Sequence, residues 1–447
     1  MTLFWLLLAV AVIIVVTAVW KIHPLPVLLL TAFFFGVCNN FGVIKTINMI
    51  SSGFGNTMKS IGIVIIAGTV IGAFMEQRGA LKVIAGKIIA LTGKKRTPLA
   101  MSIIGFLVSI CIFCDSAFVI LIGLWKKLGT MTGQAWAVGA LALSMGLYAA
   151  HCFIPPTPGP LAAMAILSAD FGRVLFFGSI AAAAATAAGY LYAVRAGKNE
   201  VLAGEKEAAG SEGDPDEKTE KPFQYHWSAA FLPIVVPLLL IGGNSFCGII
   251  KGTPAPVASF FSAAGNPVAA LTVGAFIAVF FIGRWQRSEL TTGGIMGKAI
   301  IDAANILLIT GAGGAFGEVL KQVDFRHLMP AASSSAGVFS LLFPLIFAAI
   351  LKIAQGSSTL AILTAASITV PLLDTLGLGT PVMRALSCCA VCCGGMMVSH
   401  TNDSYFWVVT RFSGMNVRQG LKLQTLGSLV SGVTGAAVLL ILAVLFR

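Results

Sequence analysis

The stretch CDSAFVIL, residues 114–121, reads against a second stretch, GSSTLAIL, residues 356–363. Each places polar residues inside a segment that is otherwise apolar. A second pair of motifs keeps almost the same separation: GTVIGAF, residues 68–74, reads against GAGGAF, residues 311–316. Because the separation between partners is nearly constant, we interpret the chain as a duplicated module in which each copy carries a polar interruption.

Composition places this duplication in a membrane. Hydrophobic residues make up 57% of the 447-residue chain and charged residues only 10%, with a mean hydropathy of +0.93. Apolar runs close to the length of a bilayer-spanning helix recur, without the alternation typical of an outer-membrane barrel. We therefore predict an all-α polytopic membrane protein. Spans are expected at 3–20, 25–43, 58–75, 136–168, 174–194, 228–250, 267–283, 299–320, 381–409 and 423–446.

The two interrupted segments, 98–124 and 336–373, are either distorted spans or re-entrant hairpins with polar tips at mid-membrane depth. The connection 78–96 carries six basic and no acidic residues, which indicates a cytoplasmic location by the positive-inside rule. If the first segment is a hairpin, Lys126 and Lys127 also fall in the cytoplasm. The first hairpin then opens to the cytoplasm and the second to the outside, which makes the duplication an inverted repeat.

The predicted architecture has about five spans plus one re-entrant hairpin in each copy. The copies are residues 1–194 and 228–447, and residues 195–227 form a flexible cytoplasmic linker that holds eight of the 17 acidic residues. Both termini fall in the periplasm under this topology. The net charge of +12 lies mostly in short connections, where it sets orientation, and we expect no nucleic-acid partner.

Asp115 and Ser116 form the polar part of the first interruption. An ionised carboxylate in hydrocarbon is costly, so Asp115 must face a cavity, a partner or a proton. We assign it to proton coupling and Ser116 to substrate binding. The alternative for Asp115 is a structural cap at the start of a helix.

The second interruption carries hydroxyl groups and a nearby lysine in place of a carboxylate. Backbone amides at such a tip suit an anionic group, although a simple Ser/Thr helix cap is the alternative. Lys352 lies one helical turn before the tip in an apolar segment, where it meets a substrate carboxylate, pairs with a buried aspartate or extends to the membrane interface. The expected substrate-binding residues here are Lys352, Gly356, Ser357, Ser358 and Thr359.

Two histidines mark predicted breaks in long apolar segments. HCFIPPTPGP, residues 151–160, contains four prolines that cannot continue a helix, and SHTNDSYFW, residues 399–407, is its counterpart. Imidazole, carboxylate and hydroxyl groups together suit a polyhydroxy acid and a proton. We assign substrate binding to His151, Thr157, His400, Asn402 and Ser404, and proton coupling to Asp403.

Five motifs, in order along the chain, resemble the signature blocks of the gluconate permease family of bacterial proton symporters, part of the ion transporter superfamily. They are CDSAFVIL, HCFIPPTPGP, GAGGAFGEVL, AQGSSTLAIL and SHTNDSYFW, and they span residues 114–407. The resemblance implies an elevator-like fold with two hairpins, commonly a homodimer, in the bacterial inner membrane. It carries a role onto Asp115, His151, residues 155–160, Gly356–Thr359, His400, Asn402 and Asp403.

Two positions depart from the family pattern. Thr157 stands where gluconate transporters tend to have a second histidine, and Tyr405 stands where they have a small residue. Both positions lie beside the predicted pocket. They leave the choice among gluconate, a related hydroxylated acid and D-serine open.

The function expected from the sequence is proton-coupled import of gluconate or a related small hydroxylated acid. Alternatives are symport of D-serine or another small organic or amino acid, sodium coupling, and a membrane-embedded metalloenzyme. The partners are a small anionic or zwitterionic substrate, protons and membrane lipid. No cofactor, catalytic residue or metal ligand is expected, because packing explains the cysteines at 388–393 better than a metal site does.

Overall fold

The computed structural model is helical throughout the part of the chain that it describes. These described residues are 2–93, 96–205, 226–249, 254–283, 286–323 and 337–446. Most of the predicted linker, residues 206–225, therefore lies outside them. Seven helical segments are long and apolar enough to cross a membrane, or eight when the pair 255–264 and 267–281, bent by 67°, is taken as one span.

The helices of the first half follow the predicted spans with one exception. The predicted span 136–168 is divided by its prolines into α7 and α8, as expected. The predicted span 58–75 is much longer in the structure. In chain order the elements are α1 (Thr2–Ile14), η1 (Val15–Val19), α2 (Pro24–Cys38), α3 (Val43–Gln77), α4 (Ala80–Thr92), α5 (Thr97–Val108), α6 (Cys114–Thr132), α7 (Trp136–Phe153), α8 (Pro158–Leu167) and α9 (Phe171–Gly197).

The second half repeats the sequence of a long helix, an interrupted segment, a broken helix and a terminal helix. Its elements are α11 (Trp227–Ile249), α12 (Ala255–Ala264), α13 (Pro267–Phe281), η3 (Arg287–Leu290), α14 (Ile295–Lys321), η6 (Gly337–Leu341), α15 (Leu342–Gln355), α16 (Ser358–Thr369), η7 (Val370–Leu372), α17 (Pro381–Met396), α18 (Ser404–Ser413), α19 (Val417–Gly420), η8 (Leu421–Thr425) and α20 (Leu426–Phe446).

Helix α3 extends well beyond the span that hydropathy predicts. Its N-terminal half is too polar to register as a membrane span, yet the helix is continuous over 35 residues. Packing against α14 explains this, because the two glycine-containing helices approach closely: a Cβ on Gly53 would lie 2.6 Å from the Gly314 carbonyl oxygen. Tertiary contact therefore sustains a helix that apolar content alone does not predict.

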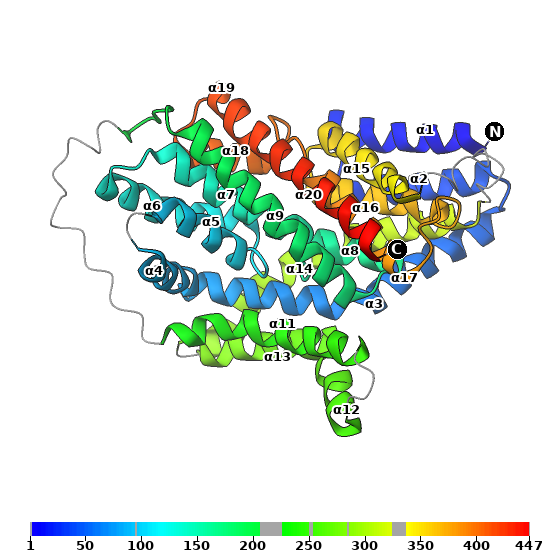
Figure 1. The fold of residues 1–447 in the computed structure, drawn as a ribbon. Coiled ribbons are helices and arrows are strands. Elements are labelled where there is room, and N and C mark those ends of the chain that lie inside the picture. The colour runs from blue at the N-terminus through cyan, green and yellow to red at the C-terminus, as the bar shows by residue number, and fades with distance from the viewer. Residues whose placement is uncertain are drawn as a thin grey trace.

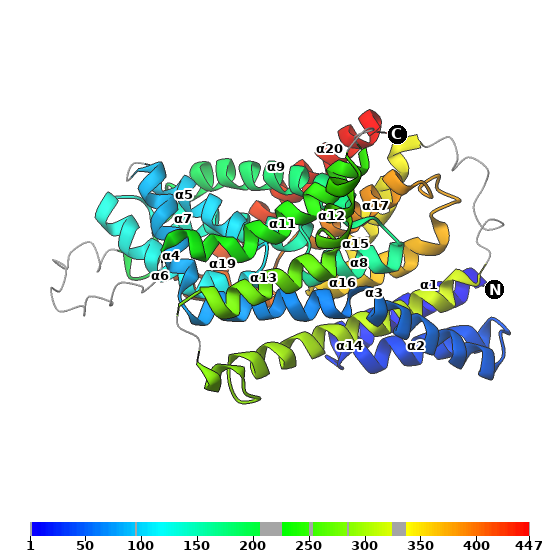
Figure 2. The same cartoon turned by 90° about the horizontal axis from the view of Figure 1, so that it is seen from below.

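Two groups of helices flank this pair. Helices α11 and α13 lie side by side along one face of α3, and α12 projects away from the bundle (Figure 1). Seen from below, α14 runs alongside α2 (Figure 2), and α1 packs against α2 in turn. The ends marked N and C lie at the same end of the molecule, opposite α4 and α6 (Figure 1).

Four irregular segments interrupt the helices between these flanks. The first tip is residues 109–113, between α5 and α6, and the second tip is residues 356–357, between α15 and α16. The first break is residues 154–157, between α7 and α8, and the second break is residues 397–403, between α17 and α18. The polar motifs identified in the sequence fall on or directly beside these four segments.

Candidate functional site

The tips and breaks converge on one region of the molecule. A Cβ on Gly72 of α3 would lie 2.7 Å from the Cys111 carbonyl oxygen, so the first tip packs against this long helix. The second tip borders the first break, because a Cβ on Gly159 would lie 3.9 Å from Thr359 Cα. The second break also hydrogen-bonds to the end of α15, directly before the second tip. The fold thus assembles the predicted site from both halves of the chain.

A buried ion pair connects the second interrupted segment to the second break. The Lys352 Nζ lies 2.6 Å from Asp403 Oδ2, and the two side chains are 0% and 4% exposed. Of the three roles considered for Lys352, pairing with a buried aspartate is therefore the one found. The ammonium group also donates to the carbonyl of Gly356 at the second tip. Burial removes water from both charged groups, so each charge is stabilised mainly by the opposite charge of its partner.

Asp403 is held by three groups besides the lysine. Its Oδ1 accepts the backbone N–H of Tyr405 at 3.1 Å, which caps α18. Its Oδ2 accepts the Ser399 hydroxyl and, at 3.5 Å, the Tyr148 hydroxyl. The Tyr148 and Ser358 hydroxyls share a 2.7 Å hydrogen bond, so the network extends to the start of α16.

Asn402 and His400 hold the second tip in place. The Asn402 side-chain amide donates to the Ile353 carbonyl at 2.6 Å, and His400 Nε2 lies 3.1 Å from the same oxygen. Gly356 has a φ of +79°, and a Cβ there would lie 2.2 Å from the Asn402 carbonyl oxygen. Glycine is required at this position because it allows both the left-handed turn and the close approach.

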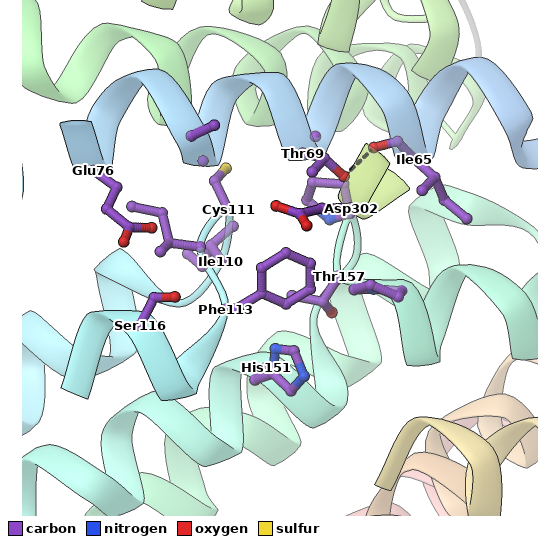
Figure 3. Close-up of a pocket in the computed structure, with 16 residues that line it drawn as sticks. Ile65, Thr69, Glu76, Ile110, Cys111, Phe113, Ser116, His151, Thr157 and Asp302 are labelled. Carbon is purple, nitrogen blue, oxygen red and sulfur yellow. Dashed lines mark hydrogen bonds between the residues drawn. The ribbon is translucent and has the colours of Figure 1, made fainter. Parts of the chain in front are cut away.

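A cavity of about 80 Å³ lies between α3, the first tip and the first break (Figure 3). Three of the predicted site residues, Ser116, His151 and Thr157, line it. His151 is only 9% exposed, and its Nδ1 is buried without a hydrogen-bond partner among the described residues. A buried polar atom without a partner is costly, so this nitrogen is suited to a ligand or a water molecule.

Asp115 occupies the first turn of α6 but is not its N-cap residue. The N-cap is Phe113, with no side-chain capping bond, while the Asp115 carboxylate accepts a hydrogen bond from the Asp115 backbone N–H within the first turn. The Cys114 thiol lies 3.7 Å from Asp115 Oδ2. Asp115 interacts electrostatically with both members of the ion pair: Asp403 repels it and Lys352 attracts it. Asp115, Asp403 and Lys352 therefore form one charge cluster that contains both predicted proton-coupling residues.

The remaining predicted site residues lie in or beside the two tips and the two breaks. The Ser357 side chain caps α16 by accepting the Leu360 N–H at 3.3 Å, so the Ser/Thr cap alternative holds for this residue. The Thr157 hydroxyl donates to the Ile154 carbonyl at 2.6 Å and is buried. Ser404 is exposed at the start of α18, and Thr359 is half-buried near the first break.

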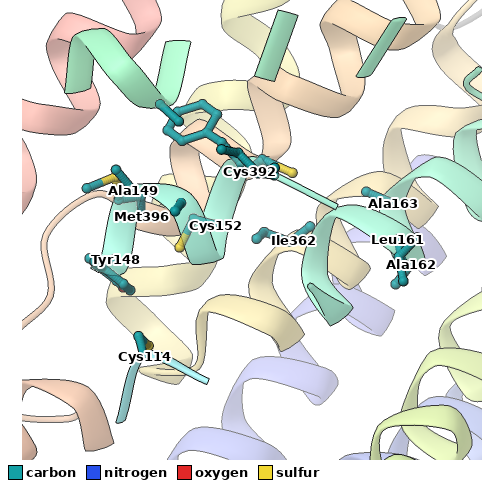
Figure 4. Packing of buried hydrophobic residues seen from close by; sticks show 14 of the residues in the cluster. Cys114, Tyr148, Ala149, Cys152, Leu161, Ala162, Ala163, Ile362, Cys392 and Met396 are labelled. Carbon is teal, nitrogen blue, oxygen red and sulfur yellow. The ribbon is translucent and has the colours of Figure 1, made fainter. Parts of the chain in front are cut away.

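The cysteines of α17 are part of the packed interior. Cys388, Cys389, Cys392 and Cys393 are fully buried, and Figure 4 shows Cys392 in the core together with Cys152 of α7. The Cys393 Sγ lies 3.1 Å from the Gly432 carbonyl oxygen, where α17 meets α20. Within the described residues, no group of three His, Cys, Asp or Glu side chains is arranged to hold a metal ion.

Sequence reasoning missed several residues of this site. Tyr148 lies three residues before the first Pro-rich motif, and Ser399 begins the motif at 399–407 but is not assigned a role there. Glu76 and Asp302 also line the cavity, and neither belongs to the five motifs that identify the site. One sequence feature could have identified Glu76. Glu76 lies two residues after the end of GTVIGAF, and Glu318 lies two residues after the end of the matching GAGGAF.

The whole chain matches a known family of membrane proteins. Residues 1–445 match the family described as GntP family permease. An uncharacterized permease from Haemophilus influenzae is 32% identical and covers 97% of this chain and 91% of its own length. A gluconate permease from Pseudomonas aeruginosa is 28% identical, covering 95% and 93%. The D-serine transporter DsdX of Escherichia coli is 27% identical, covering 97% and 96%.

Solved transporter structures share the fold. The Alcanivorax borkumensis YdaH transporter superposes with a TM-score of 0.61 at 17% identity, covering 90% of this chain and 89% of its own. Neisseria gonorrhoeae MtrF superposes with a TM-score of 0.60 at 14% identity, covering 90% and 85%. At these identities the likeness concerns architecture alone. Taken with the family match over nearly every residue, it shows that this chain belongs to the GntP permease family, a family of bacterial membrane transporters rather than enzymes.

Proposed function

We propose that this chain is a proton-coupled symporter that imports gluconate or a related small hydroxylated acid across the bacterial inner membrane. The family match and the relatives named gluconate permease support transport of this kind. The observation that carries the proposal is the buried Lys352–Asp403 ion pair at the junction of the second tip and the second break.

Charge balance in this pair provides a route to coupling. Lys352 is fully buried, so as long as it keeps its charge it needs another anion when its aspartate is neutralised. If Asp403 is protonated, a substrate carboxylate can replace it beside Lys352 and leave the net charge of the cluster unchanged. Binding of either the proton or the carboxylate alone leaves an uncompensated buried charge. The two are therefore favoured together, which is the requirement for symport.

Hydroxyl groups of the substrate have partners close by. His151 and Thr157 line the adjacent cavity, and Ser358 and Tyr148 are linked by hydrogen bonds to the ion pair. Asp115 is a second candidate for the proton, because it belongs to the same charge cluster. D-serine is a second candidate substrate, supported by the relative of that name and by the acidic side chains of the cavity.

Uptake into proteoliposomes tests the proposal. Purified protein should accumulate gluconate or a related acid when an inward proton gradient is imposed, and exchange of Na⁺ for K⁺ at constant pH should have no effect. Asp403→Asn should abolish accumulation driven by the gradient but retain exchange of internal for external substrate. Coupling belongs to Asp115 instead if Asp115→Asn shows this behaviour and Asp403→Asn still accumulates substrate.

A further inference from the structure

The polar lining of the cavity beside the first tip is acidic on one side. Glu76 of α3 and Asp302 of α14, which we call the acidic wall, face Ser116 and His151 across the cavity (Figure 3). The two carboxylates act on each other electrostatically. No Lys or Arg is among the described residues that line this space. A cavity intended only for an anion would have the opposite balance of charge.

The hydroxyl groups on this lining present acceptors. Thr69 donates its proton to the Ile65 carbonyl at 2.8 Å, and Thr157 donates to the Ile154 carbonyl at 2.6 Å. Only their lone pairs remain for a ligand. Among the described residues, neither Glu76 nor Asp302 has a hydrogen bond or an ion pair. This part of the cavity therefore matches a group that donates several hydrogen bonds and carries positive charge.

Donors gather on the other side. The buried His151 Nδ1 has no partner among the described residues, and Ser116 lies in the first turn of α6, where backbone N–H groups are free of helical bonds. Histidine, hydroxyl and amide donors at a helix N-terminus suit a carboxylate. Figure 3 shows Glu76 above Ser116, so the acceptor and donor sides are adjacent.

We propose that this cavity recognises an ammonium group on the carbon next to the substrate carboxylate, which makes the substrate an α-amino acid rather than a simple hydroxy acid. The ammonium group would lie against the acidic wall, and the carboxylate would lie toward Ser116 and His151, on the side where His151 interacts electrostatically with Asp403 of the ion pair. This inference rests on the proposed transport function and selects among its candidate substrates. A hydroxyl group at the same carbon gains hydrogen bonds but no attraction between opposite charges.

Serine and glycerate provide a matched pair, because they differ only in an ammonium or a hydroxyl group at one carbon. In proteoliposomes under a fixed proton gradient, we expect serine of one enantiomer to have a lower KM than the corresponding glycerate. Glu76→Gln and Asp302→Asn should each raise the KM for serine by about tenfold, the loss expected when one close charge partner is removed. The KM for glycerate should stay the same or fall.

Glu318→Gln serves as the control for these variants. Glu318 is the counterpart of Glu76 in the second half, but it pairs with Lys321 at 3.3 Å and does not line the cavity. It should leave both KM values unchanged. Substrate exchange without a gradient separates binding from coupling, and Glu76→Gln should weaken serine exchange while it retains glycerate exchange.

Three results would overturn the inference. The first is equal or better transport of glycerate, or accumulation of gluconate with no uptake of any α-amino acid; the proposed function would then stand. The second is equal loss of serine and glycerate accumulation in Glu76→Gln with normal exchange, which would assign Glu76 to proton coupling. The third is no accumulation of any acid or amino acid, in which case the proposed function fails as well.

Discussion

At the residue scale, the Lys352–Asp403 pair places two opposite charges in the interior of the protein. Both side chains are almost completely buried, and Asp403 collects hydrogen bonds from three further residues. Such pairs contribute little when complete, but they are costly to break on one side. Under the proposed mechanism the site therefore has two states, with Asp403 either paired with Lys352 or protonated and replaced there by another anion.

Removal of one partner should therefore be worse than removal of both. We expect Lys352→Met to destabilise the protein by about 3–5 kcal/mol, because Asp403 is left as a buried unpaired charge. The double variant Lys352→Met/Asp403→Asn should recover most of the loss, since asparagine keeps the cap on α18. Thermal unfolding in detergent measures this. An unchanged melting temperature for Lys352→Met alone would contradict it.

Gln355 differs from the ion pair because its buried polar side chain has no partner among the described residues. Both amide atoms of this side chain are buried and have no hydrogen bond among the described residues, directly beside the second tip. We expect Gln355→Met to keep or raise the melting temperature, because no hydrogen bond is lost and a desolvation cost of about 1–3 kcal/mol is relieved. A clear decrease in melting temperature would mean that the amide has a stabilising partner.

At the element scale, the position of the second tip depends on one glycine. Gly356 combines a φ of +79° with the 2.2 Å approach to the Asn402 carbonyl that a Cβ would make. The second break therefore determines where α16 begins. The same contacts bring Ser358 to Tyr148 and Lys352 to Asp403, so displacement of the tip disturbs both the network and the ion pair.

Two alanine variants distinguish the cost of a strained backbone from the cost of a steric clash between the added Cβ and its neighbours. Gly377 has a φ of +68° but no atom within 4 Å of an added Cβ, so Gly377→Ala should cost only about 1–2 kcal/mol of strain. Gly356→Ala should cost more and should also reduce uptake, because the tip must move away from Asn402. Thermal unfolding and uptake assays measure the two effects. Equal behaviour of the variants would exclude the collision.

Residues 198–205, directly after α9, form hydrogen bonds that hold the start of the linker against the helices. We call this segment the strap. Glu200 Oε1 accepts from the Lys422 ammonium at 2.7 Å, and its other oxygen accepts from Gln419 at 3.1 Å. Glu205 accepts the Trp136 backbone N–H at 2.9 Å. The strap thus joins the turn before α7 to the region around α19.

The strap should respond to acid. The hydrogen bond from Lys422, and then that from Gln419, lower the pKa of Glu200 below its ordinary value of 4.5. A lowered pKa in the folded state adds stability above the ordinary pKa, and this stability is lost as pH falls through the folded value. The wild type should therefore exceed Glu200→Gln slightly above about pH 5 and converge with it below about pH 4. Thermal unfolding across this range tests it; a constant difference would contradict it.

At the scale of the whole molecule, the inverted topology remains a prediction with a direct test. It places the connection after the first interrupted segment in the cytoplasm and the connection after the second outside. Met131 and Asp374 are exposed residues on these two connections. In a background without the nine native cysteines, an impermeant thiol reagent applied to intact cells should label Asp374→Cys and leave Met131→Cys unlabelled. Labelling of both from outside would exclude the arrangement.

Periodicity and motif spacing predicted much of the element order. The Pro-rich stretch 151–160 predicted the division between α7 and α8, and the motif at 356–363 predicted the second tip; the motif at 114–121 directly follows the first tip and begins α6. The extent of α3 could not be predicted, because its polar half is stabilised by contact with α14. The role of Lys352 also stayed open among three alternatives, since its partner lies 51 residues away in the chain.

Hydropathy, interrupted apolar segments and ordered family motifs are local properties of the chain, and they were enough to predict a helical membrane transporter. Which polar residues contact one another became visible in the three-dimensional arrangement of the helices. This arrangement paired Lys352 with Asp403, brought Tyr148 and Ser399 to the same carboxylate, and placed Glu76 opposite Ser116. The physical reason is that the energy of a buried charge depends on partners only a few ångströms away, and these partners come from distant segments.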